Sequence, residues 1–406
     1  MEKVVITGMG TVGPIGNDVA AFESNLFAGR HGIAPIDHFD TSDVSVSLCA
    51  PVKDFDAAAH FPARELRRLD PYSRFGLVAA REALDAAKIV GAVDPYRLGV
   101  FMSSGLGGVA TALDALETMR EQGPRRVSPV LIPKWIPNML GGVIAIEAGA
   151  RGPSASHSAA CATSSIAVGE AVRTIRHGYA DAVICGGAEA VTQKLVLAGF
   201  QNLRALTTAT DPDRASLPFD KERGGFVMGE GAGALVLERE SHARARGAEI
   251  YAEVSGYGVT NDASHITAPA EDGAAIDRAI ADALAEAGER EGPVHVNAHG
   301  TGTVKSDQVE GAAIGRAFGE SALVSSTKSM TGHLFGAAGA VEAIASVLAL
   351  RRGAVPPTAG TAEIDDEFAI DVVRGEARTA PITRAVSLAL GFGGHNVSLV
   401  IDGVRP

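Results

Sequence analysis

Short apolar runs alternate with longer amphipathic stretches along most of the chain. Runs of roughly four to eight apolar residues predict buried strands, and apolar residues repeating every three or four positions predict helices. The predicted strands are Lys3–Thr7, Leu98–Met102, Ala182–Cys185, Gly233–Leu237, Glu249–Val254, Val294–Asn297, Ala322–Ser325, Ala385–Leu390 and Val397–Ile401. The predicted helices are Pro71–Ala87, Thr163–Arg176, Ala274–Ala287, Gln308–Phe318 and Ala338–Arg351. This alternation predicts an α/β fold in layers, with largely buried sheets.

One local pattern occurs twice. A strand running into Gly-x-Gly is found at Val5–Thr11 and again at Val254–Thr260. The repeat suggests two halves of like topology whose strand ends face each other. We place the first half at residues 1–250 and the second at residues 251–406. A Pro-rich and basic excursion, Gly123–Pro137, interrupts the first half and holds Trp135, which is typical of an interface or a lid.

Composition narrows the class of protein. The chain has 406 residues, of which 46% are hydrophobic and 21% charged, as in ordinary globular proteins. Its net charge of −12 disfavours nucleic acid as a partner. Only three cysteines are present, and the chain enters a strand pattern at its start without a signal-peptide core. No stretch approaches the roughly 18 consecutive apolar residues of a membrane span. We therefore expect a cytoplasmic protein with no membrane partner.

Two short motifs point to other chemistries, but their surroundings do not support them. Gly8–Gly13 fits the G-x-G-x-x-G pattern of dinucleotide sites, yet Pro14 and Gly16 follow where a helix should rise. Ser325–Lys328 fits S-x-x-K, yet the chain has no K-T-G triplet. No C-x-x-C pair supports a zinc site. We therefore predict no nucleotide site, no serine acylation and no bound metal.

Cys161 lies among small residues just before the predicted helix Thr163–Arg176. A cysteine at a helix N-terminus experiences the positive end of the helix dipole and unpaired N–H groups. Both favour the thiolate, which is the nucleophilic form. The alternative is that Cys161 is a small buried hydrophobic residue, and the cysteine alone does not decide between the two.

Two histidines change that balance. His299 and His333 each follow a strand and are flanked by glycine and threonine, where side chains project into cavities. With Cys161 they indicate a Cys-His-His site, in which the imidazoles polarise a carbonyl while the thiolate attacks. The Gly-rich stretch Gly391–Asn396 also follows a strand. It either directs backbone N–H groups at an oxyanion or is simply a tight turn.

Together these motifs resemble the β-ketoacyl-acyl-carrier-protein synthases of the condensing-enzyme family, most closely the KAS II type. The resemblance runs from Val4–Gly8 to Val397–Val400 and includes Arg214–Asp220, Gly225–Gly233 and Ser325–Glu342. It implies a thiolase-like layered α-β-α-β-α fold with two pseudo-duplicated halves. It also implies a dimer that elongates acyl chains by decarboxylative Claisen condensation.

The resemblance assigns roles to individual residues. Cys161 would take an acyl group from an acyl carrier protein, and His299 and His333 would bind malonyl-carrier protein and stabilise the enolate left by loss of carbon dioxide. The N–H groups of Cys161 and Phe392 would form the oxyanion hole, with Phe392 also gating the acyl pocket. Lys328 would join the catalytic residues and order the site through hydrogen bonds with Glu342. The implied supporting residues are Glu342, Thr301 and Thr303. No metal or organic cofactor is expected, because decarboxylation supplies the carbanion and the substrates arrive on phosphopantetheine.

Basic residues suggest where a carrier protein docks. Arg64, Arg67 and Arg68 match the family's docking helix and form a cluster on an acidic chain. A solvated charged face is the alternative for each of them. Further candidates are Arg125, Arg126, Lys134 and Arg204.

The implied acyl pocket departs from the family's usual pattern. Its walls would be Leu106, Leu131, Ile132, Val196, Phe200 and Phe335. Val196 replaces a smaller residue and Phe335 a leucine, so the pocket is reshaped and the preferred chain length is left open. Val304 and Ser387–Ala389 also differ from the pattern. These changes fit a specialised role, such as a dissociated polyketide or polyene ketosynthase paired with a chain-length-factor subunit. Fatty-acid elongation and secondary metabolism both stay open as the pathway.

Two other classes remain as alternatives. A non-catalytic chain-length factor lacks the nucleophile, whereas this chain has Cys161. A thiolase-type enzyme carries a second catalytic cysteine near its C-terminus, whereas the last cysteine here is Cys185. A ketosynthase is therefore the prediction, as a homodimer or as a heterodimer with a chain-length-factor-like subunit.

Overall fold

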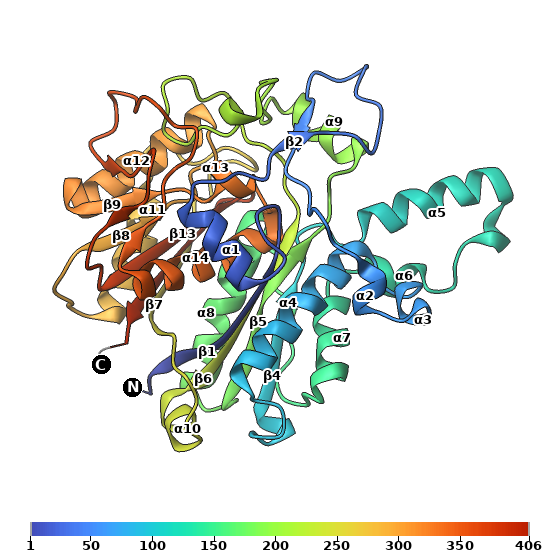
Figure 1. Ribbon diagram of the computed structural model, residues 1–406, viewed down its shortest axis with the longest axis horizontal. Coiled ribbons are helices and arrows are strands. Elements are labelled where there is room, and N and C mark those ends of the chain that lie inside the picture. Colours follow the sequence, from blue (N-terminus) through green and yellow to red (C-terminus); the bar gives the residue numbers. More distant parts are fainter. Residues whose placement is uncertain (1, 405–406) are drawn as a thin grey trace.

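The computed structural model describes residues 2–404, and its centre is a mixed sheet of ten strands (Figure 1). The first half of the chain contributes β1 (Val4–Val12), β4 (Leu98–Ser103), β5 (Ala182–Glu189) and β6 (Gly231–Arg239). The second half contributes β7 (Ala252–Asn261), β8 (Val294–Asn297), β9 (Ala322–Ser325), β11 (Asp371–Val372), β13 (Arg384–Gly391) and β14 (His395–Gly403). The strand order is β11-β9-β8-β13-β14-β7-β1-β6-β5-β4. A short antiparallel pairing of β1 with β7 joins the two sets into this one sheet, and we call the two sets its half-sheets.

Helices form three layers around the two half-sheets. The outer face of the first half is covered by α4 (Pro71–Ala87) and α7 (Met139–Ala148). The outer face of the second half is covered by α11 (Ala274–Ala287), with α12 (Val304–Phe318) beside it. Between the half-sheets lie α8 (Thr163–Arg176) and α14 (Ala338–Arg352), which pack on each other and on strands of both halves. The predicted layered fold is thus confirmed, and α14, buried from Ala338 to Ala349, is its central element.

The repeated Gly-x-Gly pattern marks the same contact in each half. A Cβ on Gly8 or Gly10 of β1 would lie 2.0 Å from a carbonyl oxygen of α4. A Cβ on Gly256 or Gly258 of β7 would lie 2.0 or 1.9 Å from a carbonyl oxygen of α11. Each central strand therefore packs its helix directly against its backbone, which only glycine allows. The two halves are duplicates in packing as well as in sequence pattern.

Many predicted boundaries coincide with the structure. These are the helices Pro71–Ala87, Thr163–Arg176 and Ala274–Ala287 and the strands Val294–Asn297 and Ala322–Ser325. The prediction ends the first strand at Thr7, whereas β1 continues to Val12 because α4 covers its glycines. The prediction starts a helix at Gln308, whereas α12 starts at Val304. The first turn of α12 is largely exposed, so its residues do not show the apolar repeat from which a helix is predicted.

The remaining elements are short or peripheral. The helices are α1 (Val19–Phe27), α2 (Ala57–His60), α3 (Ala63–Leu66), α5 (Val109–Gln122), α6 (Leu131–Trp135), α9 (Lys194–Asn202), α10 (Glu240–Ala245) and α13 (Lys328–Thr331). The short strands are β2 (Ala34–Pro35), β3 (Leu48–Cys49), β10 (Ala354–Val355) and β12 (Arg378–Thr379). The 3-10 turns are η1 (Pro95–Arg97), η2 (Pro124–Arg126), η3 (Ala160–Ala162), η4 (Pro212–Arg214), η5 (Gly319–Ser321) and η6 (Phe335–Ala337).

One region stands away from the body of the molecule. Helix α5 projects outward (Figure 1) and has no buried residue. The Pro-rich excursion Gly123–Pro137 contains η2 and α6, and Trp135 on α6 is 44% exposed. Across residues 2–404, no helix combines the length and apolar character needed to cross a membrane.

Candidate active site

Four loops from both halves meet at one cleft of about 690 Å³. Turn η3, which precedes α8, carries Cys161, and the loop after β8 carries His299. The connection from α13 to η6 carries His333, and the turn between β13 and β14 carries Phe392. All four residues line the cleft. The structure therefore brings together side chains that lie more than half the chain apart in sequence.

Cys161 sits in η3 at the N-terminus of α8, where the sequence places it. Its Sγ lies 2.9 Å from Nε2 of His333, and the backbone N–H of Phe392 donates to it. Burial raises the pKa of the Cys161 thiol to about 12, although the charge of Lys328 and the Phe392 N–H both lower it. The helix position favours a thiolate, but burial acts in the opposite direction and has the larger effect on the pKa of this thiol. The helix end does not compensate for removing the sulfur from water.

The hydrogen bonds of His333 select its tautomer. The backbone N–H of Phe335 donates to Nδ1 at 3.2 Å, so Nδ1 is the unprotonated nitrogen. Burial, together with the charge of Lys328, lowers the pKa of His333 well below its usual range and keeps the ring neutral. Its proton therefore lies on Nε2 and points toward Sγ of Cys161. His333 is thus arranged as a hydrogen-bond donor and not as a base toward the thiol.

His299 is held through its backbone. Its N–H donates to Oε1 of Glu310 at 2.6 Å, and the N–H of Gly300 donates to Oε2 at 2.7 Å. Ser326 Oγ donates to the carbonyl of Gly300 at 2.7 Å. Burial also lowers the pKa of His299 well below its usual range. Its ring lies 5.4 Å from that of His333, at an angle of 86°. Two neutral imidazoles therefore converge from different loops on one point of the cleft.

Lys328 and Glu342 form a buried ion pair beside this site. The ammonium group donates to Oε1 of Glu342, and both side chains are 2% exposed. The sequence prediction that these two residues interact therefore matches their placement. The Lys328 charge lowers the pKa of both histidines.

An aromatic cluster closes one side of the cleft. Phe335 stacks on His333 with ring centroids 4.7 Å apart and planes at 17°. Phe200 lies 5.2 Å from Phe335 and 6.1 Å from Phe392. Phe335 adopts a φ of 48°, a left-handed conformation that is strained for a large residue. The structure thus places Phe335 against a catalytic candidate as well as in the wall of a pocket.

The other expected pocket residues divide into two groups. Leu106 lines the cleft, and Val196 packs in the same apolar cluster as Cys161. Leu131 and Ile132 lie on α6, outside the cleft lining, and Ile132 is 54% exposed. In this single chain three of the six expected wall residues, Leu131, Ile132 and Val196, are therefore absent from the cleft lining.

The remaining sequence candidates lie at the surface or at the mouth of the cleft. Thr301 and Thr303 line the cleft with their Oγ1 atoms 2.9 Å apart. Arg64, Arg67 and Arg68 are exposed on and just after α3. These placements are compatible with their expected roles in binding and docking.

Sequence reasoning missed three buried carboxylates that shape the site. Glu189 accepts hydrogen bonds from Ser104 Oγ at 2.5 Å and from the N–H groups of Gly105 and Gly336 at 2.8 and 2.9 Å. Asp307 and Glu310, one turn apart on α12, hold the His299 loop. Burial raises the pKa of Asp307 to about 6 and that of Glu310 to about 8. The sequence sign of this role was the spacing of Asp307 and Glu310, one helical turn apart and directly after the loop that carries His299.

The reactive atoms of Cys161, His299 and His333 all lie within 4.8 Å of one another. Thiolate and imidazole are also ligands that zinc accepts. Here, however, the Nε2 of His333 that faces the sulfur carries a proton. A metal ion would have to displace that proton, so the arrangement fits hydrogen-bond donation to a substrate better than it fits metal binding.

Known proteins share this architecture. The family described as "Beta-ketoacyl synthase, N-terminal domain" matches residues 1–243, and "Beta-ketoacyl synthase, C-terminal domain" matches residues 251–362. The chain is 45% identical to a Synechocystis 3-oxoacyl-[acyl-carrier-protein] synthase 2 over 404 residues, which cover 98% of this chain and 97% of the relative.

Two solved structures show the same fold over nearly all of both chains. The ishigamide ketosynthase/chain length factor superposes with a TM-score of 0.92 at 36% identity, covering 100% of each chain. A type II polyketide synthase complex of an acyl-carrier protein with its ketosynthase superposes with a TM-score of 0.92 at 30% identity, covering 99% of this chain and 100% of that one.

Proposed function

The chain belongs to the β-ketoacyl synthase family and is an acyl-transferring condensing enzyme, and we propose that it condenses an acyl group held on Cys161 with malonyl-acyl-carrier protein. The observation that carries this proposal is the contact of 2.9 Å between Sγ of Cys161 and the protonated Nε2 of His333. It places a nucleophile and an enolate-stabilising donor at one point.

In the first half-reaction, Cys161 attacks the thioester carbonyl of an acyl-carrier protein. The new bond joins Sγ to the acyl carbon, and the bond to the pantetheine sulfur breaks. The thiol proton leaves with the pantetheine thiol, so the exchange is balanced. The oxyanion forms beside the N–H of Phe392, which already donates to Sγ in the resting site.

In the second half-reaction, malonyl-carrier protein replaces the first carrier. The bond between its carboxylate and methylene carbons breaks, carbon dioxide leaves, and the electron pair moves onto the thioester oxygen as an enolate. The neutral rings of His299 and His333 donate to that oxygen. The enolate carbon then attacks the acyl-Cys161 carbonyl, and the sulfur leaves and takes up a proton. No metal or organic cofactor is needed in this scheme, because carbon dioxide loss generates the carbanion.

The partner of this reaction is a phosphopantetheine-bearing, acidic acyl carrier protein. The support is the exposed arginine cluster at α3 on a chain of net charge −12. A structural relative is a ketosynthase bound to its acyl-carrier protein. Electrostatic complementarity of this kind mainly speeds and orients encounter.

A second copy of the chain completes the site in this proposal. Large apolar side chains are exposed on α5, α6 and α7, among them Met119, Trp135 and Ile146, at 44%, 44% and 81%. Such a surface is typical of an interface. Covering it from a second copy would also place Leu131 and Ile132 of each chain in an enclosed environment.

The alternative is a ketosynthase of a dissociated polyketide or polyene pathway, paired with a chain-length-factor subunit. The observation that favours it is the likeness to the ishigamide ketosynthase/chain length factor, combined with the bulky Phe335 in the pocket. The two readings share the chemistry of Cys161 and differ in cargo and partner.

Intact-mass analysis of the purified chain with acyl-carrier proteins of graded chain length tests both readings. We expect one acyl adduct, absent in Cys161→Ala, and 3-oxoacyl product only after malonyl-carrier protein is added. Condensation by Cys161→Ala would overturn the mechanism. Size-exclusion chromatography of the chain alone separates a homodimer from a monomer that awaits a different subunit.

A further inference from the structure

One backbone segment, Gly224–Gly229, contacts both catalytic histidine loops, and we name it the spine. The N–H of Gly225 donates to the carbonyl of Gly302 at 2.9 Å, in the loop of His299. The N–H of His333 donates to the carbonyl of Val227 at 2.7 Å, and the N–H of Gly229 donates back to the carbonyl of His333 at 2.9 Å. The spine therefore joins, through backbone hydrogen bonds, the two loops that carry His299 and His333.

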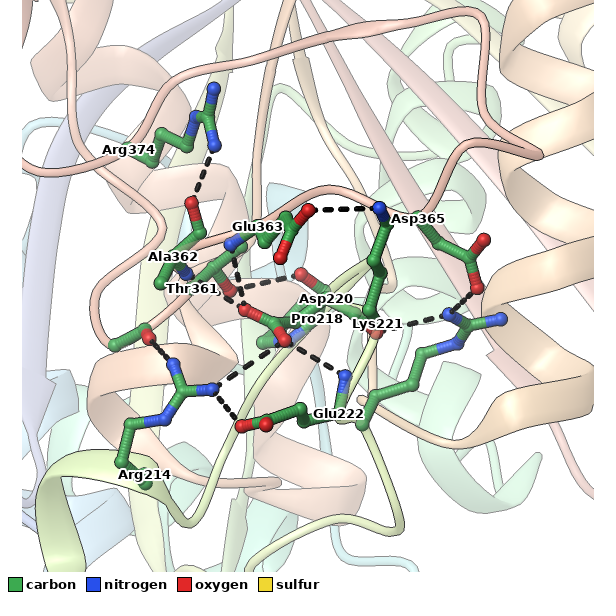
Figure 2. A network of polar contacts seen from close by, with 12 residues as sticks. Arg214, Pro218, Asp220, Lys221, Glu222, Thr361, Ala362, Glu363, Asp365 and Arg374 are labelled. Atoms are coloured by element: carbon green, nitrogen blue, oxygen red, sulfur yellow. Dashed lines mark hydrogen bonds and ion pairs between the residues drawn. The ribbon is translucent and has the colours of Figure 1, made fainter.

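A polar network around the buried carboxylate of Asp220 fixes the chain just before the spine (Figure 2). The carboxylate of Asp220 accepts from the N–H groups of Ala362 and Glu363 at 2.7 and 3.2 Å and from that of Glu222 at 2.9 Å. Asp220 is 1% exposed. It thereby ties the chain just before the spine to the loop at residues 361–363.

Arg223, the residue directly before the spine, is the second anchor. Its side chain is 3% exposed and pairs with Asp365 at 2.7 Å and with Glu367 at 2.5 Å. It also donates to the carbonyl of Asp220 at 3.0 Å and lies 4.9 Å from the ring centroid of Phe368. Both terminal nitrogens of Arg223 are therefore used in holding this segment, whereas its buried Nε has no partner.

The same network reaches the His299 loop by a second route. Asp307 accepts from the N–H of Phe219 at 2.8 Å and from that of Gly302 at 3.1 Å. The Arg223 charge lowers the pKa of Asp307, against the larger effect of burial. Arg223 therefore favours the ionised carboxylate that holds the Gly302 N–H. Loss of Arg223 would loosen the His299 loop at both its Gly302 contacts.

We propose that Arg223 is a positioning residue for the decarboxylation half-reaction, because through the spine it sets the separation of His299 and His333. This inference rests on the proposed function. Its role is selective, since the oxyanion contact of the acylation step comes from Phe392 in the β13–β14 turn, which the spine does not hydrogen-bond. Acylation of Cys161 should therefore tolerate a change that decarboxylation does not.

The test compares Arg223→Met, Arg223→Lys and the matched control Lys221→Met. Lys221 lies two residues away and pairs with Glu363 and Asp366 at the surface of the same network. For each variant two rates are measured: acylation of Cys161 by intact mass, and carbon dioxide release from malonyl-carrier protein in a single turnover. Misplacement by about 1 Å costs about 10²-fold in rate.

We expect Arg223→Met to slow carbon dioxide release about 10²-fold, while the acylation rate stays within about threefold of the unaltered chain. Arg223→Lys should recover part of the lost rate. Lys221→Met should change neither the acylation rate nor carbon dioxide release. Equal loss of both rates, or no loss, would overturn the inference. Should Arg223→Met not fold, Asp365→Asn weakens the same anchor at a half-buried position and carries the same expectation. Failure of the unaltered chain to release carbon dioxide would instead overturn the proposed function.

Discussion

The two helices of the central layer, α8 and α14, begin with the same unusual backbone turn but have different roles. Turn η3 leads into α8 and turn η6 leads into α14, and the first residue of each turn has a left-handed backbone, with φ of 49° at Ala160 and 48° at Phe335. The second position is Cys161 in η3 and Gly336 in η6. The duplication thus supplies two equivalent turns, of which one presents the nucleophile.

The reason for the difference lies in what each second position faces. The Cys161 side chain points into the cleft beside His333. A Cβ at Gly336 would lie 2.5 Å from the backbone nitrogen of Gly105 and 2.8 Å from Oε2 of Glu189. The η6 turn is packed onto the first half of the protein and leaves no room for a side chain. Duplicated geometry therefore does not duplicate function, because the surroundings of the two turns are not symmetric.

We expect the largest loss of rate when His333, which the second half contributes to the site, is removed. His333→Ala removes the Nε2–H donor beside Cys161. Removing one preorganised donor to an oxyanion costs about 10²–10³ in rate, so carbon dioxide release from malonyl-carrier protein should fall by that factor. Acylation of Cys161, followed by intact mass, should survive. Unchanged carbon dioxide release would show that His299 alone carries the enolate.

The pH dependence of stability tests the role of Glu310, which holds the His299 loop in the second half. Burial raises the pKa of Glu310 from 4.5 to about 8, so the folded state keeps its proton more tightly than the unfolded state. Between these values the unfolded state binds fewer protons, and the contribution of Glu310 to stability falls as pH rises. We expect the stability of Glu310→Gln relative to the unaltered chain to rise by a few kcal/mol between about pH 5 and pH 9. Denaturant unfolding at several pH values measures this, and a pH-independent difference would contradict it.

Gly336→Ala tests the packing of the η6 turn directly. The added methyl group meets backbone as well as the Glu189 carboxylate, so the turn must shift. Overpacking of this kind costs about 1–3 kcal/mol, and we expect a lower thermal midpoint together with slower condensation. Gly142→Ala, where a Cβ meets nothing within 4 Å, is the matched control. Equal behaviour of the two variants would remove the packing argument.

The smallest effect concerns the surface of the first half. Arg67→Ala removes one exposed charge from the cluster at α3. A rim charge mainly alters association rates, so KM for the carrier protein should rise about two- to threefold at low salt, with kcat unchanged. The difference should shrink as ionic strength increases. A lower kcat with unchanged KM would argue against a docking role.

Sequence reasoning succeeded where local pattern and tertiary environment agree. Helices α4, α8 and α11 begin and end at the predicted residues because their apolar faces repeat at helical spacing. Pro71 at the start of α4 and Gly288 after α11 add end signals. Cys161, His299 and His333 were identified from motifs and from family resemblance, and the structure places them in one cleft. Strand β1 was cut short at its glycines because glycine normally weakens a strand.

Other features depended on distant parts of the chain. Nothing near Glu189 in the sequence shows that it bridges Ser104 and Gly336. The position of Cys161 at a helix start favours the thiolate, but burial raises the pKa of its thiol, and the loops that bury it lie far away in the sequence.

By itself, the sequence determined the order of elements, the duplication marked by Gly-x-Gly and the identity of the reactive side chains, since each is encoded over a few neighbouring residues. The tertiary structure alone decided the tautomer of His333, the protonation of the Cys161 thiol and the link from Arg223 through the spine to both imidazoles. These properties follow from desolvation and hydrogen bonds between loops far apart in the chain, and such terms exist only once the two halves have packed.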